Sequence, residues 1–102
     1  MKQGDIILMD AGYRPAVIIS QTAFNQKRNL VLVCPITNNI KPLRFHVLLD
    51  GRTQTQGDVI CEQVRVIDLL ARKCKTIEQI PRDLLEQILQ AVSTIITLED
   101  EV

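Results

Sequence analysis

Two short polar segments hold the side chains that are best placed to carry chemistry. They are Tyr13-Arg14-Pro15 and Pro35-Ile36-Thr37-Asn38-Asn39. Each segment adjoins a β-branched run, and polar groups beside a rigid sheet can be held in a fixed geometry. Arg14 offers cationic hydrogen-bond donors, and Thr37 offers a hydroxyl group beside two amides. Each segment also has an ordinary structural interpretation, because an arginine beside a proline at a strand start is commonly solvated and Thr-Asn-Asn commonly forms a turn.

The sequence lacks most other catalytic signatures. Its one histidine, His46, lies between Phe45 and Val47 in a strand-like run. We therefore expect it to face the opposite side from both neighbours and to be exposed rather than catalytic. No pattern supports a Ser/His/Asp triad or a phosphate-binding loop, and one histidine cannot form a histidine-based metal site. We therefore expect neither a metal nor a cofactor.

The cysteines do not indicate a site of their own. Cys34, Cys61 and Cys74 are odd in number and lack CxxC spacing. This pattern indicates neither a disulfide framework nor a zinc site. We expect each cysteine to be a small buried apolar residue in a reducing compartment.

Runs of β-branched and aliphatic residues predict the strands that position the two polar segments. The runs cover residues 5–10, 15–20, 30–35, 44–49 and 57–67, and a further short strand covers 74–79. The continuous apolar runs are typical of strands that are covered on both faces. Residues 21–29 are mainly polar and predict a surface loop with room for one helical turn, and residues 68–73 predict a turn.

The apolar period changes after Pro81. Leucine, isoleucine and valine then recur at the i, i+4, i+7 or i+8 spacing of an amphipathic helix. Pro81 suits a first helical position, and Asp83 and Glu86 lie where the helix dipole favours negative charge. Strands followed by one helix predict a mainly β fold, either a small barrel or a twisted sheet. We divide the single domain 1–102 into a β body at 1–79, a helix at 81–97 and an acidic tail at 98–102.

Charge is unevenly distributed along the chain. Residues 1–75 contain eleven Lys or Arg against six Asp or Glu, a net charge of +5, whereas residues 76–102 contain one against six, a net charge of −5. A basic body suits a polyanionic ligand, and an acidic end can repel such a ligand or shield the body from it. Scattered solvated charges are the alternative interpretation.

Size and apolar content predict a homodimer. The chain has 102 residues, and its only aromatic residues are Tyr13, Phe24 and Phe45. A domain of this size buries a modest fraction of its surface, and oligomerisation is a common remedy. We find neither a secretory signal nor an apolar run of the roughly 18 residues that a membrane span needs. We therefore expect a cytoplasmic protein without a membrane partner.

A series of short segments along nearly the whole chain forms a recognisable order. The segments are Gly4-Asp5-Ile6, Arg14-Pro15-Ala16-Val17-Ile18-Ile19-Ser20, Asn25, Leu30-Val31-Leu32-Val33-Cys34-Pro35-Ile36-Thr37, Phe45, residues 59–64 with Glu62-Gln63-Val64, and Ala71-Arg72-Lys73. This order resembles the MazF/PemK family of toxin endoribonucleases of type II toxin–antitoxin systems. A single such motif can occur by chance, but so many motifs in the same order along the chain are specific to the family.

The resemblance implies an SH3-like small β-barrel of the MazF/PemK/CcdB type with a C-terminal helix. It also implies a homodimer, cleavage of single-stranded RNA at short sequences, and inhibition by a cognate MazE/PemI-like antitoxin, with any contact to DNA made only through that antitoxin. Arg14 and Thr37 then occupy the catalytic Arg and Thr positions of the family. The side chains that the resemblance places beside RNA are Asn38, Asn39, Lys41 and Gln63.

The chemistry of these side chains agrees with that assignment. RNA supplies its own nucleophile, the 2′-hydroxyl group, so an enzyme mainly has to align it and stabilise charge on the phosphoryl oxygens. Arg14 can bind those oxygens with its bidentate fork, and Thr37 can add a neutral hydrogen bond. We assign Arg14 to electrostatic stabilisation because a guanidinium does not lose its proton readily near neutral pH.

One segment departs from the family pattern. Only Ala11, Gly12 and Tyr13 join the first strand to Arg14, where the family has a longer loop that borders the RNA. Tyr13 is a candidate to stack on a base in compensation. The departure leaves two alternatives to an active, sequence-specific ribonuclease. One is a relative with little or no activity that binds RNA or antitoxin, and the other is a toxin of the same fold that binds DNA gyrase.

Overall fold

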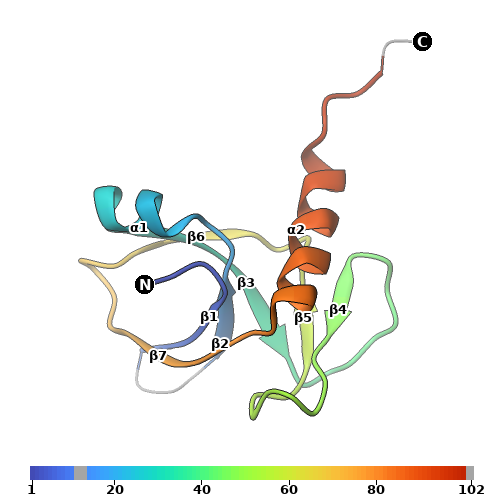
Figure 1. Ribbon diagram of the computed structural model, residues 1–102, viewed down its shortest axis with the longest axis horizontal. Helices are drawn as coiled ribbons and strands as arrows, with labels where there is room; N and C mark the ends of the chain where they lie inside the picture. The colour runs from blue at the N-terminus through green and yellow to red at the C-terminus, as the bar shows by residue number, and fades with distance from the viewer. Residues whose placement is uncertain (11–13, 101–102) are drawn as a thin grey trace.

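An antiparallel sheet and a C-terminal helix dominate the part of the chain that the computed structural model describes, residues 1–10 and 14–100 (Figure 1). Seven strands lie in these residues: β1 (Asp5–Met9), β2 (Pro15–Ile18), β3 (Leu30–Thr37), β4 (His46–Leu48), β5 (Asp58–Ile60), β6 (Arg65–Asp68) and β7 (Cys74–Gln79). The two helices are α1 (Thr22–Arg28) and α2 (Arg82–Ile96).

β3 is the central strand of the sheet. The strand order is β4-β5-β3-β2-β1-β7, and β6 also pairs with β3. Along one edge β3 pairs with β2, and along its other edge it pairs first with β6 and then with β5. The mainly β class with a C-terminal helix is therefore confirmed. The sheet is open rather than a closed barrel, because β4 and β7 lie at the two ends of the strand order and do not pair with each other.

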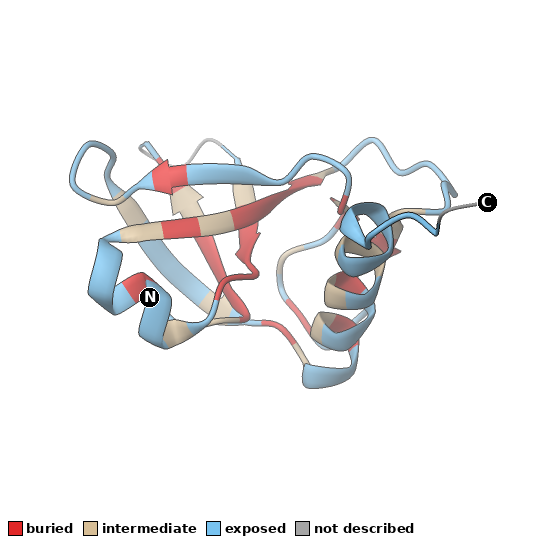
Figure 2. Ribbon diagram, turned by 90° about the horizontal axis from the view of Figure 1, so that it is seen from above, coloured by how far each residue is buried: buried red, intermediate tan, exposed pale blue. Residues whose placement is uncertain are grey.

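Both faces of the central strands are buried, as the continuous apolar runs predict. Ile6 and Val17 point into a cluster that also contains Leu84 and Ile88 of α2. Their chain neighbours Ile7 and Ile18 point into a second cluster on the other face. Figure 2 shows this burial as red segments along the central strands and along one side of α2. The period-two alternation of side chains thus fills two cores from one strand.

The amphipathic helix predicted after Pro81 is confirmed as α2. Leu84 and Ile88 are its buried residues, and Pro81 occupies the N-cap position. The aliphatic side chains packed behind them give the helix an apolar stripe that covers one core cluster. Neither helix in residues 1–10 and 14–100 is long and apolar enough to cross a membrane.

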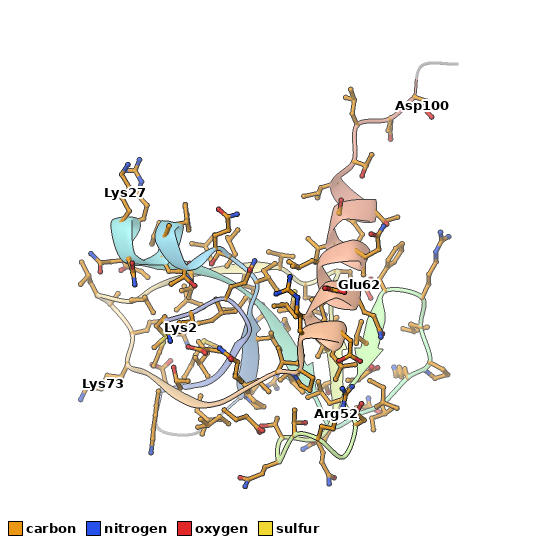
Figure 3. All side chains as sticks on the ribbon, viewed as in Figure 1. Lys2, Lys27, Arg52, Glu62, Lys73 and Asp100 are labelled. Atoms are coloured by element: carbon orange, nitrogen blue, oxygen red, sulfur yellow. The ribbon has the colours of Figure 1, made fainter. Side chains whose placement is uncertain are left out.

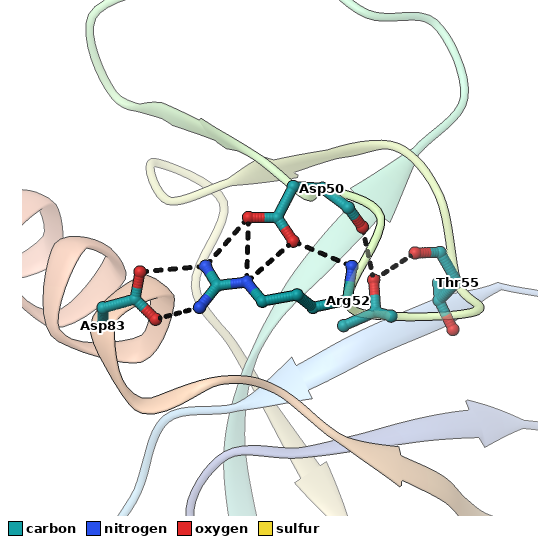
Figure 4. Close-up of polar contacts among 5 residues, drawn as sticks. Asp50, Arg52, Thr55 and Asp83 are labelled. Carbon is teal, nitrogen blue, oxygen red and sulfur yellow. Dashed lines mark hydrogen bonds and ion pairs between the residues drawn. The ribbon is translucent and has the colours of Figure 1, made fainter.

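An arginine clamp fastens the start of α2 to the loop between β4 and β5 (Figure 4). The two terminal nitrogens of Arg52 donate to the two carboxylate oxygens of Asp83, each at 2.9 Å. The same guanidinium donates to Asp50, with Nη2 at 2.8 Å from Oδ2. These bonds hold the pKa values of both aspartates below their usual range. The clamp therefore links this loop to the first turn of α2, and Glu78 of β7 links it to the sheet through hydrogen bonds from Gln54 and Thr55.

The prediction of a surface loop with room for one helical turn at residues 21–29 is only partly right, because the seven-residue helix α1 occupies most of this segment. Asn25 is the buried residue of α1, and its side-chain amide donates to the carbonyl oxygens of Met1 and Ser20 at 3.0 and 3.3 Å. Asn29 ends the helix in the left-handed conformation, with φ of 53°. The helix is thus anchored by a buried amide rather than by an apolar stripe, which explains why apolar periodicity did not reveal it.

The single strand predicted at residues 57–67 is wrong, because a turn divides it into β5 and β6. In the register of β5, Ile36 faces Val59, which would bring Val33 opposite Glu62. Val33 instead faces Arg65 in β6, so the residues between the two strands leave the sheet. The amide of Gln63 donates to the carbonyl oxygen of Ile60 at 3.2 Å and closes this turn.

The cysteines differ in burial. Cys34 and Cys61 are fully buried, as expected, whereas Cys74 at the start of β7 is only partly buried. All three are free thiols.

Candidate functional site

The two polar segments meet at one end of the sheet. β2 and β3 are antiparallel, with Ala16 opposite Pro35 and Val17 opposite Cys34. Extending this register past the start of β2 places Arg14 opposite Thr37, the last residue of β3. Both side chains line a hollow of about 400 Å³. The structure therefore brings together the two residues that the sequence singles out as a catalytic pair.

Other predicted site residues surround the same pair. Asn38, Asn39 and Gln63 line the hollow of Arg14 and Thr37. Lys41 lies one step further along, in an adjoining hollow of about 290 Å³ that shares Thr37, Asn39 and Gln63. Tyr13, the proposed stacking residue, and the short connection at residues 11–13 lie outside the described residues.

Thr37 is held in place by its neighbours on both sides. Its Oγ1 accepts a hydrogen bond from the backbone amide of Asn39 at 3.1 Å, which leaves the hydroxyl proton to donate elsewhere. On the other side, Gly57 has φ of +138°, and a Cβ atom there would lie 2.5 Å from the carbonyl oxygen of Thr37. A glycine thus permits the close approach of the β5 segment to the end of β3.

The turn between β5 and β6 delivers Gln63 to the hollow. Both Glu62 and Gln63 are exposed in this turn, next to the end of β3. The Gln63 side-chain oxygen accepts a hydrogen bond from Arg65 Nη2 at 3.4 Å. A regular strand, as predicted from the sequence, would have alternated these side chains across the two faces of the sheet.

Arginines extend the site on the far side of Arg14. A hollow of about 240 Å³ is lined by Arg14, Arg65 and Arg72 together with apolar residues and Asp10. Asp10 accepts hydrogen bonds from the guanidinium of Arg72, including one from Nε at 2.9 Å. Our sequence reasoning missed Arg65 as a site residue. The antiparallel pairing of β6 with β3 brings Arg65 to this hollow, and the spacing of residues in the sequence does not reveal that pairing.

His46 contradicts its prediction, because its side chain is only 7% exposed. Nδ1 lies 2.8 Å from Asp58 Oδ2, and Nε2 lies 3.0 Å from Glu62 Oε1. The face of β4 that carries His46 was expected to be exposed to solvent, but the side chains of Asp58 and Glu62 cover it. Burial lowers the pKa of His46, but the hydrogen bonds to the two carboxylates outweigh burial and raise the pKa above its ordinary value. Sequence alternation could not anticipate these partners.

The charge asymmetry of the sequence is visible in space. In Figure 3 the labelled Lys2, Lys27 and Lys73 lie on the side of the molecule with α1 and β7, and Asp100 lies at the far end of the tail after α2. The tail that carries Asp100 therefore projects away from the sheet, whereas the acidic residues Glu78, Asp83 and Glu86 lie on β7 and α2. A polyanion can approach the basic side without meeting the tail.

The fold and its site define a small β protein with one C-terminal helix and a cationic hollow at the end of its central strands. Residues 2–96 match the family described as PemK-like, MazF-like toxin of type II toxin-antitoxin system. The chain is 39% identical over 90 residues to Endoribonuclease PemK of Escherichia coli, covering 84% of this chain and 68% of that protein. It is 35% identical over 78 residues to Endoribonuclease toxin MazF of Escherichia coli strain K12, covering 68% and 69%. The chain belongs to this family of toxins.

Solved structures share the fold across nearly the whole chain. A chain of the crystal structure of MazE-MazF (Form-II) from Deinococcus radiodurans superposes with a TM-score of 0.89 and 24% identity, and the match covers 97% of each chain. An endoribonuclease in complex with its cognate antitoxin from a mycobacterial species superposes with a TM-score of 0.85 and 17% identity, covering 99% of each chain. At these identities the likeness concerns the fold, including its C-terminal helix.

Proposed function

We propose that this toxin is an endoribonuclease that cleaves single-stranded RNA at short sequences, without a metal, by attack of the substrate's own 2′-hydroxyl group. The observation that carries the proposal is Arg14 opposite Thr37 in one hollow at the end of the sheet. Two relatives that share more than a third of their aligned residues with the chain are named endoribonucleases, which supports the same activity.

The two residues suit two parts of one transition state. Negative charge develops on the non-bridging oxygens of the scissile phosphate, and the planar fork of Arg14 can bind two such oxygens at once. The Thr37 hydroxyl can donate one neutral hydrogen bond to the same group, because Asn39 uses only its acceptor capacity. Preorganised donors of this kind lower the barrier without moving a proton themselves. The remaining polar residues, Asn38, Asn39, Lys41 and Gln63, are then available to bind the nucleotides beside the scissile bond.

Cleavage is expected to continue in excess EDTA and to leave a 2′,3′-cyclic phosphate and a 5′-hydroxyl group. Attack of the 2′-oxygen on phosphorus breaks the bond to the 5′-oxygen, and in the net reaction the proton of the 2′-hydroxyl group passes to that leaving oxygen. Arg14 and Thr37 can supply the alignment and charge stabilisation that this step needs. The measurement is digestion of a long RNA by the purified protein, with and without EDTA, followed by analysis of the product termini.

Products that carry a 5′-phosphate would contradict attack by the 2′-hydroxyl, and loss of cutting in EDTA would contradict the metal-free mechanism. RNA binding without any cleavage would identify a catalytically inactive relative. Absence of both binding and cleavage, together with binding to DNA gyrase, would favour the gyrase-directed alternative.

Thr37→Ala is expected to slow cleavage by about 10- to 1000-fold, because it removes one neutral donor to the developing charge. Thr37→Ser is the matched control, since it keeps the hydroxyl group and should keep most of the rate. Single-turnover cleavage of one RNA by each variant gives the comparison. Equal rates for the alanine and serine variants would remove the hydroxyl group from the mechanism.

We further propose that the toxin acts in the cytoplasm as a homodimer and is inhibited by an acidic, partly disordered antitoxin. Large apolar side chains are exposed on one protomer, among them Val66 at 61%, Leu70 at 81% and Ile96 at 75%. A second copy can cover such side chains. An acidic antitoxin segment would be attracted to the arginines beside Arg14 and would compete with RNA for them.

A further inference from the structure

His46 joins a buried carboxylate to an exposed one. Asp58 faces its Nδ1 from β5, and the Asp58 side chain is only 3% exposed. Glu62 faces its Nε2 from the turn after β5, and the Glu62 side chain is 49% exposed. Both ring nitrogens therefore point at hydrogen-bond acceptors. An imidazole can donate to both acceptors only when it carries its second proton.

The buried end of this chain of contacts is fixed. Asp58 Oδ2 also accepts a hydrogen bond from the backbone amide of Lys41 at 3.3 Å, so its position is set by two neighbouring segments. β4 and β5 are paired, with His46 opposite Ile60, which keeps the imidazole over β5. Asp58 and His46 are therefore held by the paired strands, whereas the exposed Glu62 carboxylate is held only through its contact with His46.

Glu62 reaches the region where RNA is expected to lie. It lines the hollow of about 290 Å³ together with Thr37, Lys41, Gln63 and His46 itself. That hollow adjoins the one formed by Arg14 and Thr37. Two carboxylates beside a bound polyanion would repel it, and a protonated His46 reduces the net charge of the Asp58, His46 and Glu62 group from −2 to −1.

Other titratable groups surround His46 on every side. Burial lowers the pKa of His46, and the hydrogen bonds to Asp58 and Glu62 more than offset it, so the imidazole keeps its proton above its ordinary range. The remaining neighbours are the Cys61 thiol, Lys41 and Arg44 on the preceding segment, and Asp83 and Glu86 of α2 across a hollow of about 660 Å³. The acidic pair on α2 is engaged by arginines, Asp83 by Arg52 and Glu86 by Arg82.

We propose that His46 is a positioning residue of the RNA site: anchored on Asp58, it fixes the Glu62 carboxylate beside Thr37 and offsets its charge, so that RNA binds well only while the imidazole is protonated. This inference rests on the proposed ribonuclease function. The proposal attributes the effect on RNA affinity to the contact between His46 and Glu62. A histidine with only a structural role would stabilise the fold through its buried contact with Asp58.

The sign of the pH effect follows from the direction of the pKa shift. Below the raised pKa the imidazolium donates to both carboxylates. As pH rises through that value, one ring nitrogen becomes an acceptor that faces a carboxylate oxygen, the contact with Glu62 is lost, and the group returns to a net charge of −2. RNA affinity is therefore expected to fall with rising pH, by on the order of tenfold for one added negative charge near the phosphates.

The test separates binding from chemistry with a 2′-O-methyl RNA, which lacks the nucleophile. Its affinity for the full-length wild-type protein is measured from about pH 6 to about pH 9, a range that begins near the ordinary pKa of histidine and extends well above it. Because His46 is the one histidine in the chain, its imidazole protons titrate in an NMR spectrum without ambiguity. The affinity loss is expected to follow that titration. It should be absent in His46→Gln and smaller in Glu62→Gln, where deprotonation of His46 still adds one negative charge but releases no carboxylate beside the RNA.

Each outcome decides between the proposals. A His46→Gln protein that folds and shows the wild-type pH dependence overturns the positioning role and leaves the ribonuclease proposal intact. Should His46→Gln fail to fold, Glu62→Gln decides in its place, because its exposed side chain leaves the buried contact with Asp58 untouched. An affinity loss in Glu62→Gln equal to that of the wild type then overturns the role. A wild-type protein that neither binds nor cleaves RNA at any pH overturns the ribonuclease proposal and this inference with it.

Discussion

Arg14→Ala is expected to abolish RNA cleavage, by more than about a thousandfold, while the protein stays folded. One neutral donor in such a site is worth about 10²- to 10³-fold in rate, and a bidentate cationic donor is worth more. Arg14 is exposed and precedes β2, so its side chain contributes nothing to the two core clusters. The measurement is single-turnover cleavage of a long RNA, with thermal unfolding to confirm the fold.

Arg14→Lys provides the matched control for charge. Lysine keeps the positive charge but lacks the planar fork, so it should retain part of the affinity for RNA and recover little of the rate. Recovery of the full rate in Arg14→Lys would show that charge alone suffices. Cutting at the wild-type rate by a folded Arg14→Ala protein would remove Arg14 from the mechanism altogether.

The main elements could be predicted because apolar periodicity records burial directly. Ile6-Ile7 in β1 and Val17-Ile18 in β2 alternate between two cores, and Leu84 and Ile88 mark the buried stripe of α2. Such patterns need no knowledge of partners, since a side chain that leaves water has the same chemistry wherever it packs.

The elements that the sequence did not reveal depend on polar contacts or on register. α1 is held by the buried amide of Asn25, a residue type that favours loops by composition alone. The turn between β5 and β6 arises because β3 is paired with both strands in different registers, and the run at residues 57–67 shows no break in its composition. A pairing offset is a property of two strands, so one of them cannot reveal it.

Some residues of the candidate site could be predicted from the sequence, and others could be found only in the structure. Arg14 and Thr37 could be chosen from the sequence because the family resemblance adds to their places at a strand start and a strand end. The antiparallel pairing of β2 and β3 then brings them together. The group of His46, Asp58 and Glu62 could not be chosen in this way, because it needs the cross-strand pairing of β4 and β5 and the turn that follows. The contacts of the two acidic side chains with the histidine between them appear only in the structure.

Gly57→Ala is expected to damage both stability and cleavage, although residue 57 touches no substrate. At φ of +138° an alanine is strained, and its Cβ atom would lie 2.5 Å from the carbonyl oxygen of Thr37 and 2.9 Å from Ile36 Cγ2. Overpacking costs about 1–3 kcal/mol and the unfavourable backbone about 1–2 kcal/mol, so the free energy of unfolding should fall by about 2–5 kcal/mol. Thermal unfolding should show a Tm lower by at least about 8 °C.

The rate of cleavage at a temperature where Gly57→Ala is still folded tests whether the strand contact positions the site. If the end of β3 moves to relieve the overlap, Thr37 moves with it, and a displacement approaching 1 Å costs about 10²-fold in a reaction that depends on alignment. Gly51→Ala is the matched control, because a Cβ atom at Gly51 meets no atom within 4 Å, so the variant should unfold and cleave like the wild type. A Gly57→Ala protein that is destabilised but cleaves at the wild-type rate would show that the end of β3 yields without displacing Thr37. In that case the position of Thr37 would not depend on its contact with β5.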